Sequence, residues 1–296
     1  MVEKSAFRTS AVYSGCMNAL YLLSGGKTMK KFHKITAAIL SAVVVLSAAA
    51  SFTSVDAQAA VSDYTGKTIA VTGDSISSFA GVIPSTYDFS YPEGEVAYPN
   101  QTWWGIVIDS VKAKRGMICG SNMTTVAGNS LETRSKVGCS MKRVFDVGAV
   151  KPDVIFVYLG VNDLLQDIPL GSYYAGKPVV AEGEVNNFAD GYNMMIVKLK
   201  ALYPNAQIIC MTCPMVTSYT DYATKAGASV RKNKLGLTIN DYNNVIRQVS
   251  ANYGCKLIDA YYCGLTAENA ALFTREGIHP NGVGMQLIAN YILMSL

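Results

Sequence analysis

The sequence predicts an α/β fold: a three-layer α/β/α sandwich around a mainly parallel sheet of five strands. Short apolar runs alternate along the chain with longer segments that have apolar residues at helical spacing. Such alternation builds βαβ units, in which right-handed crossovers join parallel strands. No linker, repeat or low-complexity stretch divides these elements, so we expect one domain. The predicted strands are residues 67–71, 117–119, 153–159, 206–212 and 255–258.

Helices and loops fill the intervals between the predicted strands. Residues 79–100 are rich in Pro, Gly, Tyr and Ser without helical periodicity, which indicates a long loop. Further loops are expected over 121–135, from 160 to about 184, and over 214–236. The apolar spacing predicts helices over residues 103–111, 141–147, 187–202, 238–252 and 282–294.

The first predicted strand leads into Gly73-Asp74-Ser75. Gly, Asp and Ser in succession form tight turns and place polar side chains at the end of a strand. A serine in this position is a candidate nucleophile if a base and an oxyanion site lie nearby. Taken alone, the motif is better explained as a plain turn.

Two more polar groups are predicted at the same edge of the sheet. The run 153–159 is typical of a strand buried on both faces, and it ends in Gly160-Val161-Asn162-Asp163. Gly128 lies in the loop that follows another strand. Open α/β sheets place their sites at the carboxyl ends of the strands, so this edge is the expected site.

The base can be identified by elimination, because the chain contains only His33 and His279. His33 falls in a segment that we expect to be removed. If the protein pairs a serine nucleophile with a histidine base, that base is therefore His279. It lies in the segment 275–281, just before the last predicted helix.

Four motifs, in this order, resemble the four sequence blocks of the SGNH (GDSL-type) hydrolases. They are Gly73-Asp74-Ser75, Gly128 in a small polar loop, Gly160-x-Asn162-Asp163, and His279-Pro280. Each block alone is a weak signal, but all four occur in order on the expected elements. The resemblance spans the chain from about residue 67 to the C-terminus.

The resemblance implies a flavodoxin-like sandwich in which Ser75 is the nucleophile and His279 its base. It also implies an oxyanion hole made by the backbone N–H groups of Ser75 and Gly128 and the side-chain amide of Asn162. The family usually has Asp three residues before the histidine, and here that position is Glu276. We expect Glu276 to complete the triad, since its geometry tolerates either acid. The alternatives are a backbone carbonyl that orients His279, and a Glu276 that is merely solvated.

Other reactive side chains are expected to have structural roles. Asp74 and Asp163 are interpreted as turn and hydrogen-bonding residues. Cys210-x-x-Cys213 has the spacing of a redox or zinc motif, but it continues an apolar strand and lacks a second pair. Cys210 is therefore expected in the core, and no metal and no cofactor are predicted. Disulfides among the six cysteines after residue 60 are compatible with export, but the sequence indicates no pairing.

Residues 29–59 have the pattern of a secretory signal peptide. A basic start is followed by an apolar stretch, 35–50, and by Ala57-Gln58-Ala59. The apolar stretch is shorter than the roughly 20 residues of a membrane-spanning helix. We expect Met29 to be the natural start, residues 1–28 to be an upstream extension, and residues 60–296 to be a secreted domain without stable membrane insertion.

The formal net charge of +4 belongs to the N-terminal segment. Residues 1–59 hold six of the 25 basic and two of the 21 acidic residues, which leaves 19 of each. The remaining chain is formally neutral and gives no reason to expect nucleic acid as a partner.

The substrate is less well indicated than the chemistry. The predicted loops contain many tyrosines, which suit stacking on sugar rings but are equally ordinary in ordered loops. No apolar lid helix for long acyl chains is evident. We expect an esterase for short acyl esters, in particular acetyl esters, on carbohydrate. The alternatives are a lysophospholipase or thioesterase, and a non-catalytic carbohydrate-binding protein on a hydrolase fold. The tyrosines are Tyr87, Tyr91, Tyr98, Tyr173, Tyr174, Tyr219 and Tyr222.

Overall fold

The computed structural model describes residues 63–296, except 130, 132–135 and 184. The predicted upstream extension (1–28) and signal peptide (29–59) lie outside these residues, so export stays a prediction. Five parallel strands form one sheet in the order β2-β1-β3-β4-β7, which is the flavodoxin-like order. The predicted fold class and all five strands are confirmed. Their bounds are β1 Thr68–Gly73, β2 Lys114–Gly120, β3 Val154–Tyr158, β4 Gln207–Met211 and β7 Lys256–Ile258.

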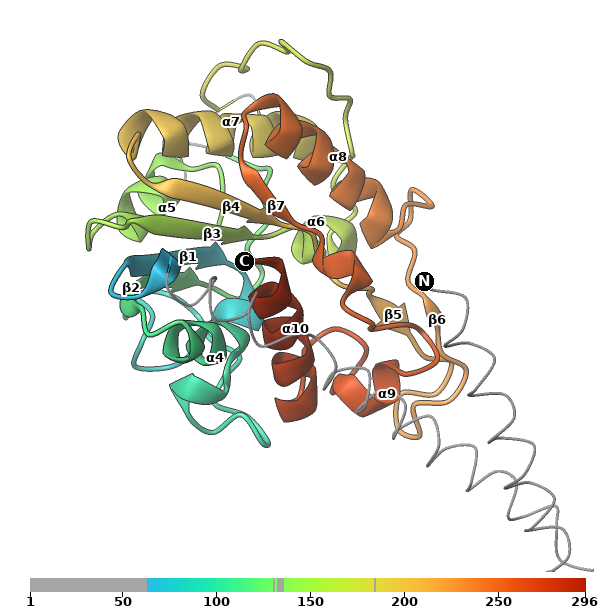
Figure 1. The fold of residues 1–296 in the computed structure, drawn as a ribbon. Coiled ribbons are helices and arrows are strands. Elements are labelled where there is room, and N and C mark those ends of the chain that lie inside the picture. The colour runs from blue at the N-terminus through green and yellow to red at the C-terminus, as the bar shows by residue number, and fades with distance from the viewer. Residues whose placement is uncertain (1–62, 130, 132–135, 184) are drawn as a thin grey trace, which may run out of the picture. The chain divides into compact units, whose positions relative to one another are not determined.

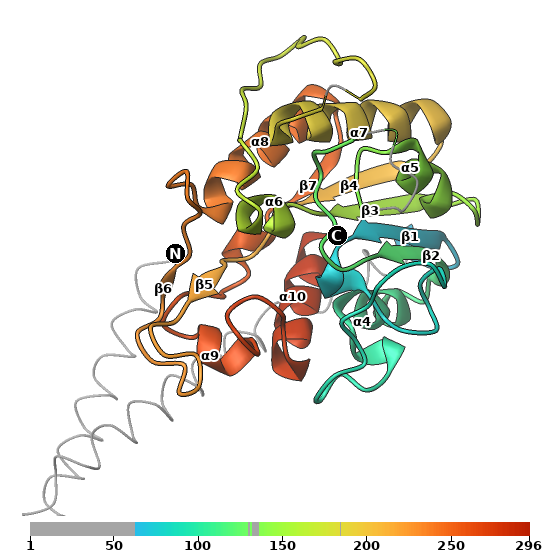
Figure 2. The ribbon, with the colours of Figure 1, turned by 180° about the vertical axis from the view of Figure 1, so that it is seen from behind.

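Helices cover both faces of the sheet and make the three layers (Figures 1 and 2). One layer contains α5 (Met141–Val147), α7 (Phe188–Leu202) and α8 (Ile239–Asn252). The other contains α4 (Trp103–Ser110) and α10 (Gly282–Ser295), which pack against each other. The middle strand β3 is buried along its whole length, so apolar cores lie on both of its faces.

Each of the five predicted helices begins within about two residues of its expected position, because a polar side chain caps it. The side-chain oxygen of the N-cap residue accepts a backbone N–H from the first turn in α4, α5, α7 and α10, and a capping box starts α8. The capping residues are Thr102, Ser140, Asn187, Thr238 and Asn281.

The shortest elements were not predicted, because a single turn is too short to show a period. The loop expected after β3 begins instead with the helix α6, and the loop 214–236 contains a small antiparallel ribbon, β5 with β6. Among the described residues, none of the helices has the length and apolar character needed to cross a membrane. The unpredicted elements are α6 Val161–Leu165, β5 Thr217–Ser218, β6 Ser229–Val230, α9 Ala270–Phe273, and the 3₁₀ helices η1 Ser75–Ser77, η2 Pro99–Gln101 and η3 Ala260–Tyr262.

Candidate active site

The side chains of Ser75 and His279 meet although their positions in the sequence differ by 204: Nε2 of His279 lies 2.8 Å from Oγ of Ser75. Ser75 opens η1, directly after β1, and the carboxylate of Asp74 accepts the N–H of Ile76 at 2.9 Å. This turn fixes the serine at the carboxyl end of the strand. Its side chain is recessed, with 7% of the residue exposed.

Glu276 contacts the other side of the imidazole ring. Its Oε1 accepts the backbone N–H of His279 at 3.1 Å and contacts Nδ1 of the ring. Burial acts to raise the pKa of Glu276, but the hydrogen bond and the charge of His279 outweigh it and hold that pKa below its ordinary value. Glu276 is thus an anion at neutral pH, and it contacts the imidazole ring. The sequence had left two alternatives open: a backbone carbonyl that orients His279, and a Glu276 that is merely solvated.

The loop that carries Glu276 and His279 is held by contacts from two distant segments. The backbone N–H of Thr217, in β5, donates to the carbonyl of Gly277 at 2.9 Å. Gly277 has a φ of +89°, and a Cβ there would lie 2.4 Å from the Thr217 carbonyl oxygen, so only glycine fits. From the other side, the hydroxyl of Tyr91 donates to the carbonyl of Pro280 at 2.7 Å.

The ends of three neighbouring strands lie level at this edge of the sheet. Gly73, the last residue of β1, is in register with Gly120 of β2 and with Tyr158 of β3. The backbone of Gly120 packs against the Ser75 turn so closely that a Cβ would lie 2.5 Å from the carbonyl carbon of Ser77. The loop after β2, which contains Gly128, therefore begins beside the serine.

Asn162 and Asp163, at the start of α6, fasten that loop to β3. The Asn162 side-chain amide donates to the carbonyl of Thr124 at 3.0 Å. The Asp163 carboxylate accepts the backbone N–H groups of Val126 at 2.8 Å and Ala127 at 3.1 Å. Burial raises the pKa of Asp163 to about 7, against these two donors. Asp163 thus has the hydrogen-bonding role expected from the sequence, and it positions Gly128.

The proposed oxyanion donors retain unused N–H groups. Within the described part of the chain, the backbone N–H groups of Ser75 and Gly128 donate to no acceptor. The Asn162 amide uses one of its two N–H groups on Thr124, which leaves the other. Asp74, the residue before Ser75, is also buried. Burial raises its pKa to about 6, while the Ile76 N–H and the charge of His279 oppose that rise.

Arg143, in α5, organises the same edge and was not identified from the sequence. Its buried guanidinium donates to the carbonyl of Gly73 at 3.2 Å, to the carbonyl of Cys119, and to the hydroxyl of Thr124 at 2.7 Å. It also stacks 4.7 Å from the ring centre of Tyr87. The Arg143 side chain thus joins the ends of β1 and β2 to the loop after β2, whose Thr124 carbonyl accepts the Asn162 amide.

We expect Arg143→Lys to lower kcat by about 10- to 100-fold with little change in KM. Lysine keeps the charge but cannot hold three acceptors in one plane, and Arg143 positions the oxyanion donors without touching substrate. Steady-state kinetics on an aryl acetate checks this, with Lys142→Ala on the same helix as the control. A kcat within twofold of the parent would show that Arg143 does not position the site.

In the described chain, the two thiols of the Cys210-x-x-Cys213 motif have different neighbours. Cys210 is buried, as predicted, and its hydrogen bond to Cys255 together with burial raises its pKa well above the ordinary value. The Cys213 thiol instead contacts the carbonyl of Leu159 at 3.5 Å. In the described chain all six cysteines are free, and no cluster of three or more His, Cys, Asp or Glu residues could hold a metal.

The loop tyrosines divide into two groups. Three of them are buried: Tyr87 packs against Arg143, Tyr91 against Arg275, and Tyr219 against the backbone of Gly277. These three contact residues that form or adjoin the site. Tyr173 is partly buried against the core. The tyrosines that remain open to a ligand are Tyr98, Tyr174 and Tyr222.

Comparison with known proteins identifies the family and agrees with the fold. Residues 71–287 match the model of the GDSL-like Lipase/Acylhydrolase family. A putative GDSL-like lipase from Bacteroides ovatus aligns with a TM-score of 0.56 at 19% identity, over 77% of this chain and 96% of that one. For one from Bacteroides uniformis, the values are 0.55, 20%, 77% and 93%. For a protein from Lactobacillus plantarum, they are 0.57, 21%, 77% and 95%. No curated protein matches.

Proposed function

Since this chain belongs to the GDSL-like lipase/acylhydrolase family, we propose that it hydrolyses carboxylic esters with Ser75 as the nucleophile. The observation that carries the proposal is the continuous contact from Glu276 through His279 to Ser75. A serine hydroxyl is a weak nucleophile until a base takes its proton, and this base is oriented by a third group. Here His279 is placed to take the proton of Ser75, and Glu276 is placed to orient His279.

In the proposed reaction, Ser75 Oγ attacks the ester carbonyl while Nε2 of His279 takes its proton. Glu276 holds Nδ1–H and stabilises the imidazolium that forms. The negative charge on the carbonyl oxygen is received by the N–H groups of Ser75 and Gly128 and by the Asn162 amide. Collapse expels the alcohol, which takes the proton from His279. Water, activated by the same imidazole, then hydrolyses the acyl group from Ser75.

We expect Glu276→Gln to reduce kcat by roughly 10²- to 10⁴-fold, the scale at which loss of the triad acid acts elsewhere. The amide is neutral and can present N–H to Nδ1, which favours the wrong tautomer of His279. Glu276→Asp keeps the charge and loses one methylene, so its kcat should lie between that of Glu276→Gln and that of the parent protein. Equal rates for Glu276→Gln and the parent protein would assign the orientation of His279 to another group.

The acid side of the stability profile tests the same carboxylate independently. Because folding lowers the pKa of Glu276, its contribution to stability is present above the ordinary carboxyl pKa and is lost as pH falls through the folded value. Thermal unfolding of Glu276→Gln should therefore depend less on pH in this acidic range than unfolding of the parent protein. Equal pH dependence would contradict a lowered pKa of Glu276 in the folded protein.

For the substrate, we infer a short acyl group, with acetyl as the first choice, on a carbohydrate alcohol. The recessed Ser75 side chain supports a small acyl group. The exposed Tyr98, Tyr174 and Tyr222 support a sugar as the alcohol, because tyrosine rings stack on sugars.

A panel of esters tests the substrate assignment. We would measure kcat/KM of the purified protein on an aryl acetate, an aryl octanoate, an acetylated polysaccharide, a lysophospholipid and an acyl thioester. Preference for both acetates supports the assignment. Preference for the octanoate and lysophospholipid, or for the thioester, would replace the acetyl-carbohydrate substrate with the corresponding class. No turnover of any ester would favour a non-catalytic binding protein.

A further inference from the structure

A hollow of about 400 Å³ opens between α4 with η2 on one side and the edge strand β2 on the other. Its floor is apolar and includes Pro99, Trp104 and Ile108. The indole N–H of Trp104 is already used, since it donates to the carbonyl of Ser77 at 3.0 Å. The floor therefore offers carbon surface and no free polar group of Trp104.

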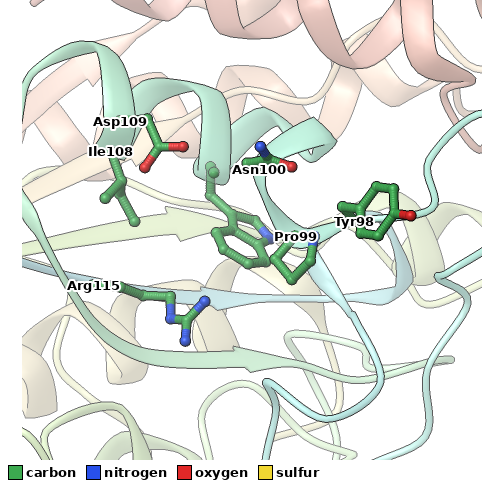
Figure 3. Close-up of a pocket in the computed structure, with 8 residues that line it drawn as sticks. Tyr98, Pro99, Asn100, Ile108, Asp109 and Arg115 are labelled. Carbon is green, nitrogen blue, oxygen red and sulfur yellow. The ribbon is translucent and has the colours of Figure 1, made fainter.

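The rim of this hollow is polar and carries unlike groups. Arg115 provides only donors, Asp109 provides only acceptors, and Asn100 provides both. In the described chain, these three side chains have no hydrogen-bond or ion-pair partner. Tyr98 completes the rim with a ring that is 66% exposed. Figure 3 shows Arg115 on the strand side, Asp109 and Asn100 on the helix side, and Tyr98 at one end.

The combination of groups selects the chemical class of the ligand. An anion would be attracted by Arg115 but repelled by Asp109, and a cation would meet the reverse. A neutral polyhydroxyl compound satisfies both, because each hydroxyl donates and accepts. Its C–H faces fit the apolar floor and the exposed ring of Tyr98. These features match a neutral sugar residue.

The hollow is close to the catalytic loop along the chain. The carboxylate of Glu95 accepts the backbone N–H of Gly282, three residues after His279, at 3.2 Å. Tyr98 follows Glu95 by three residues, and three extended residues span at most about 11 Å. Tyr98, at one end of the rim, is therefore joined to the end of the catalytic loop by a short segment.

We propose that this hollow binds a neutral sugar residue of the same polysaccharide chain whose acyl ester reacts at Ser75. The inference rests on the proposed ester hydrolysis and adds a second contact for a polymeric substrate. A small aryl ester fills only the space at Ser75, whereas a polysaccharide contacts both places. The hollow should thus contribute to KM for the polymer and not for the small ester.

The kinetic test uses the full-length protein with O-acetylated xylan, O-acetylated mannan and 4-nitrophenyl acetate. Tyr98→Ala and Arg115→Ala should lower the ratio of kcat/KM on the better polysaccharide to kcat/KM on the aryl acetate about tenfold, through KM. Two matched controls should keep the ratio within twofold of the parent value. Tyr262→Ala removes a tyrosine that is as exposed as Tyr98 but belongs to η3 and has no proposed part in substrate binding. Lys114→Ala removes the exposed cation next to Arg115 in β2. Because successive side chains of a strand point to opposite faces, Lys114 is expected to face away from the hollow.

A binding measurement keeps the outcomes distinct from those of the ester assay. Titration calorimetry of the parent protein with deacetylated xylan and mannan oligosaccharides should give a heat of binding that Tyr98→Ala lowers. Sugar binding without turnover of any ester would remove the proposed hydrolysis and leave the hollow as a sugar site. Equal binding by the parent and Tyr98→Ala, no binding of either sugar, or an unchanged kinetic ratio in both hollow variants would overturn the hollow as a sugar site.

Discussion

Replacing Ser75 by alanine is expected to reduce aryl acetate hydrolysis by at least about 10⁴-fold. The Oγ atom lies 2.8 Å from Nε2 of His279 and is the atom proposed to form the acyl bond. Without it, only the oxyanion donors and substrate binding can contribute. Initial rates at saturating substrate measure the loss, and the folded state is checked by thermal unfolding.

Ser77→Ala is the matched control for this prediction. Ser77 belongs to the same 3₁₀ turn, but its hydroxyl accepts the indole N–H of Trp103 at 3.2 Å and does not face His279. The same chemical change at Ser77 should therefore lower stability and retain most of the activity. If Ser75→Ala and Ser77→Ala had equal rates, Ser75 could not be the nucleophile.

Replacing His279 by alanine is expected to cause a loss of similar size, because Ser75 would have no base. The two residues act as one unit, so the double variant Ser75→Ala/His279→Ala should be no slower than either single variant. Kinetics of the three proteins on one substrate measures this coupling. Losses that multiply in the double variant would mean that Ser75 and His279 act independently, which the observed contact does not allow.

The parts of the fold that the sequence predicted are those with long-range patterns. The β3 run is apolar at every position because helices cover both of its faces, so the sequence shows a continuous signal. The helices of seven or more residues show a period and a capping side chain. The single-turn helix α6 has neither, since its N-cap is Gly160, which makes no side-chain hydrogen bond.

Candidate site residues could be predicted where the chain has few residues of the required type or where they fall in a recognised motif. His279 could be found because the chain has only one other histidine, and Glu276 because it occupies the position at which the resembled family usually has Asp. Arg143 was missed because a charged residue in a short helix is usually solvent-exposed. A signal was present: Arg143 lies four residues before the buried Val147, and therefore on the buried face of α5. The burial of Tyr87, Tyr91 and Tyr219 depends on distant segments and left no such local sign.

The most direct test of the central claim is to trap the covalent intermediate. The purified protein would be treated with a fluorophosphonate, which reacts with activated serine nucleophiles, and the modified residue located by peptide mass spectrometry. One adduct per chain on the peptide that contains Ser75, absent in Ser75→Ala and much slower to form in His279→Ala, is the predicted result. An adduct on another residue, or no adduct on a protein that still hydrolyses esters, would contradict the assignment of Ser75 as the nucleophile.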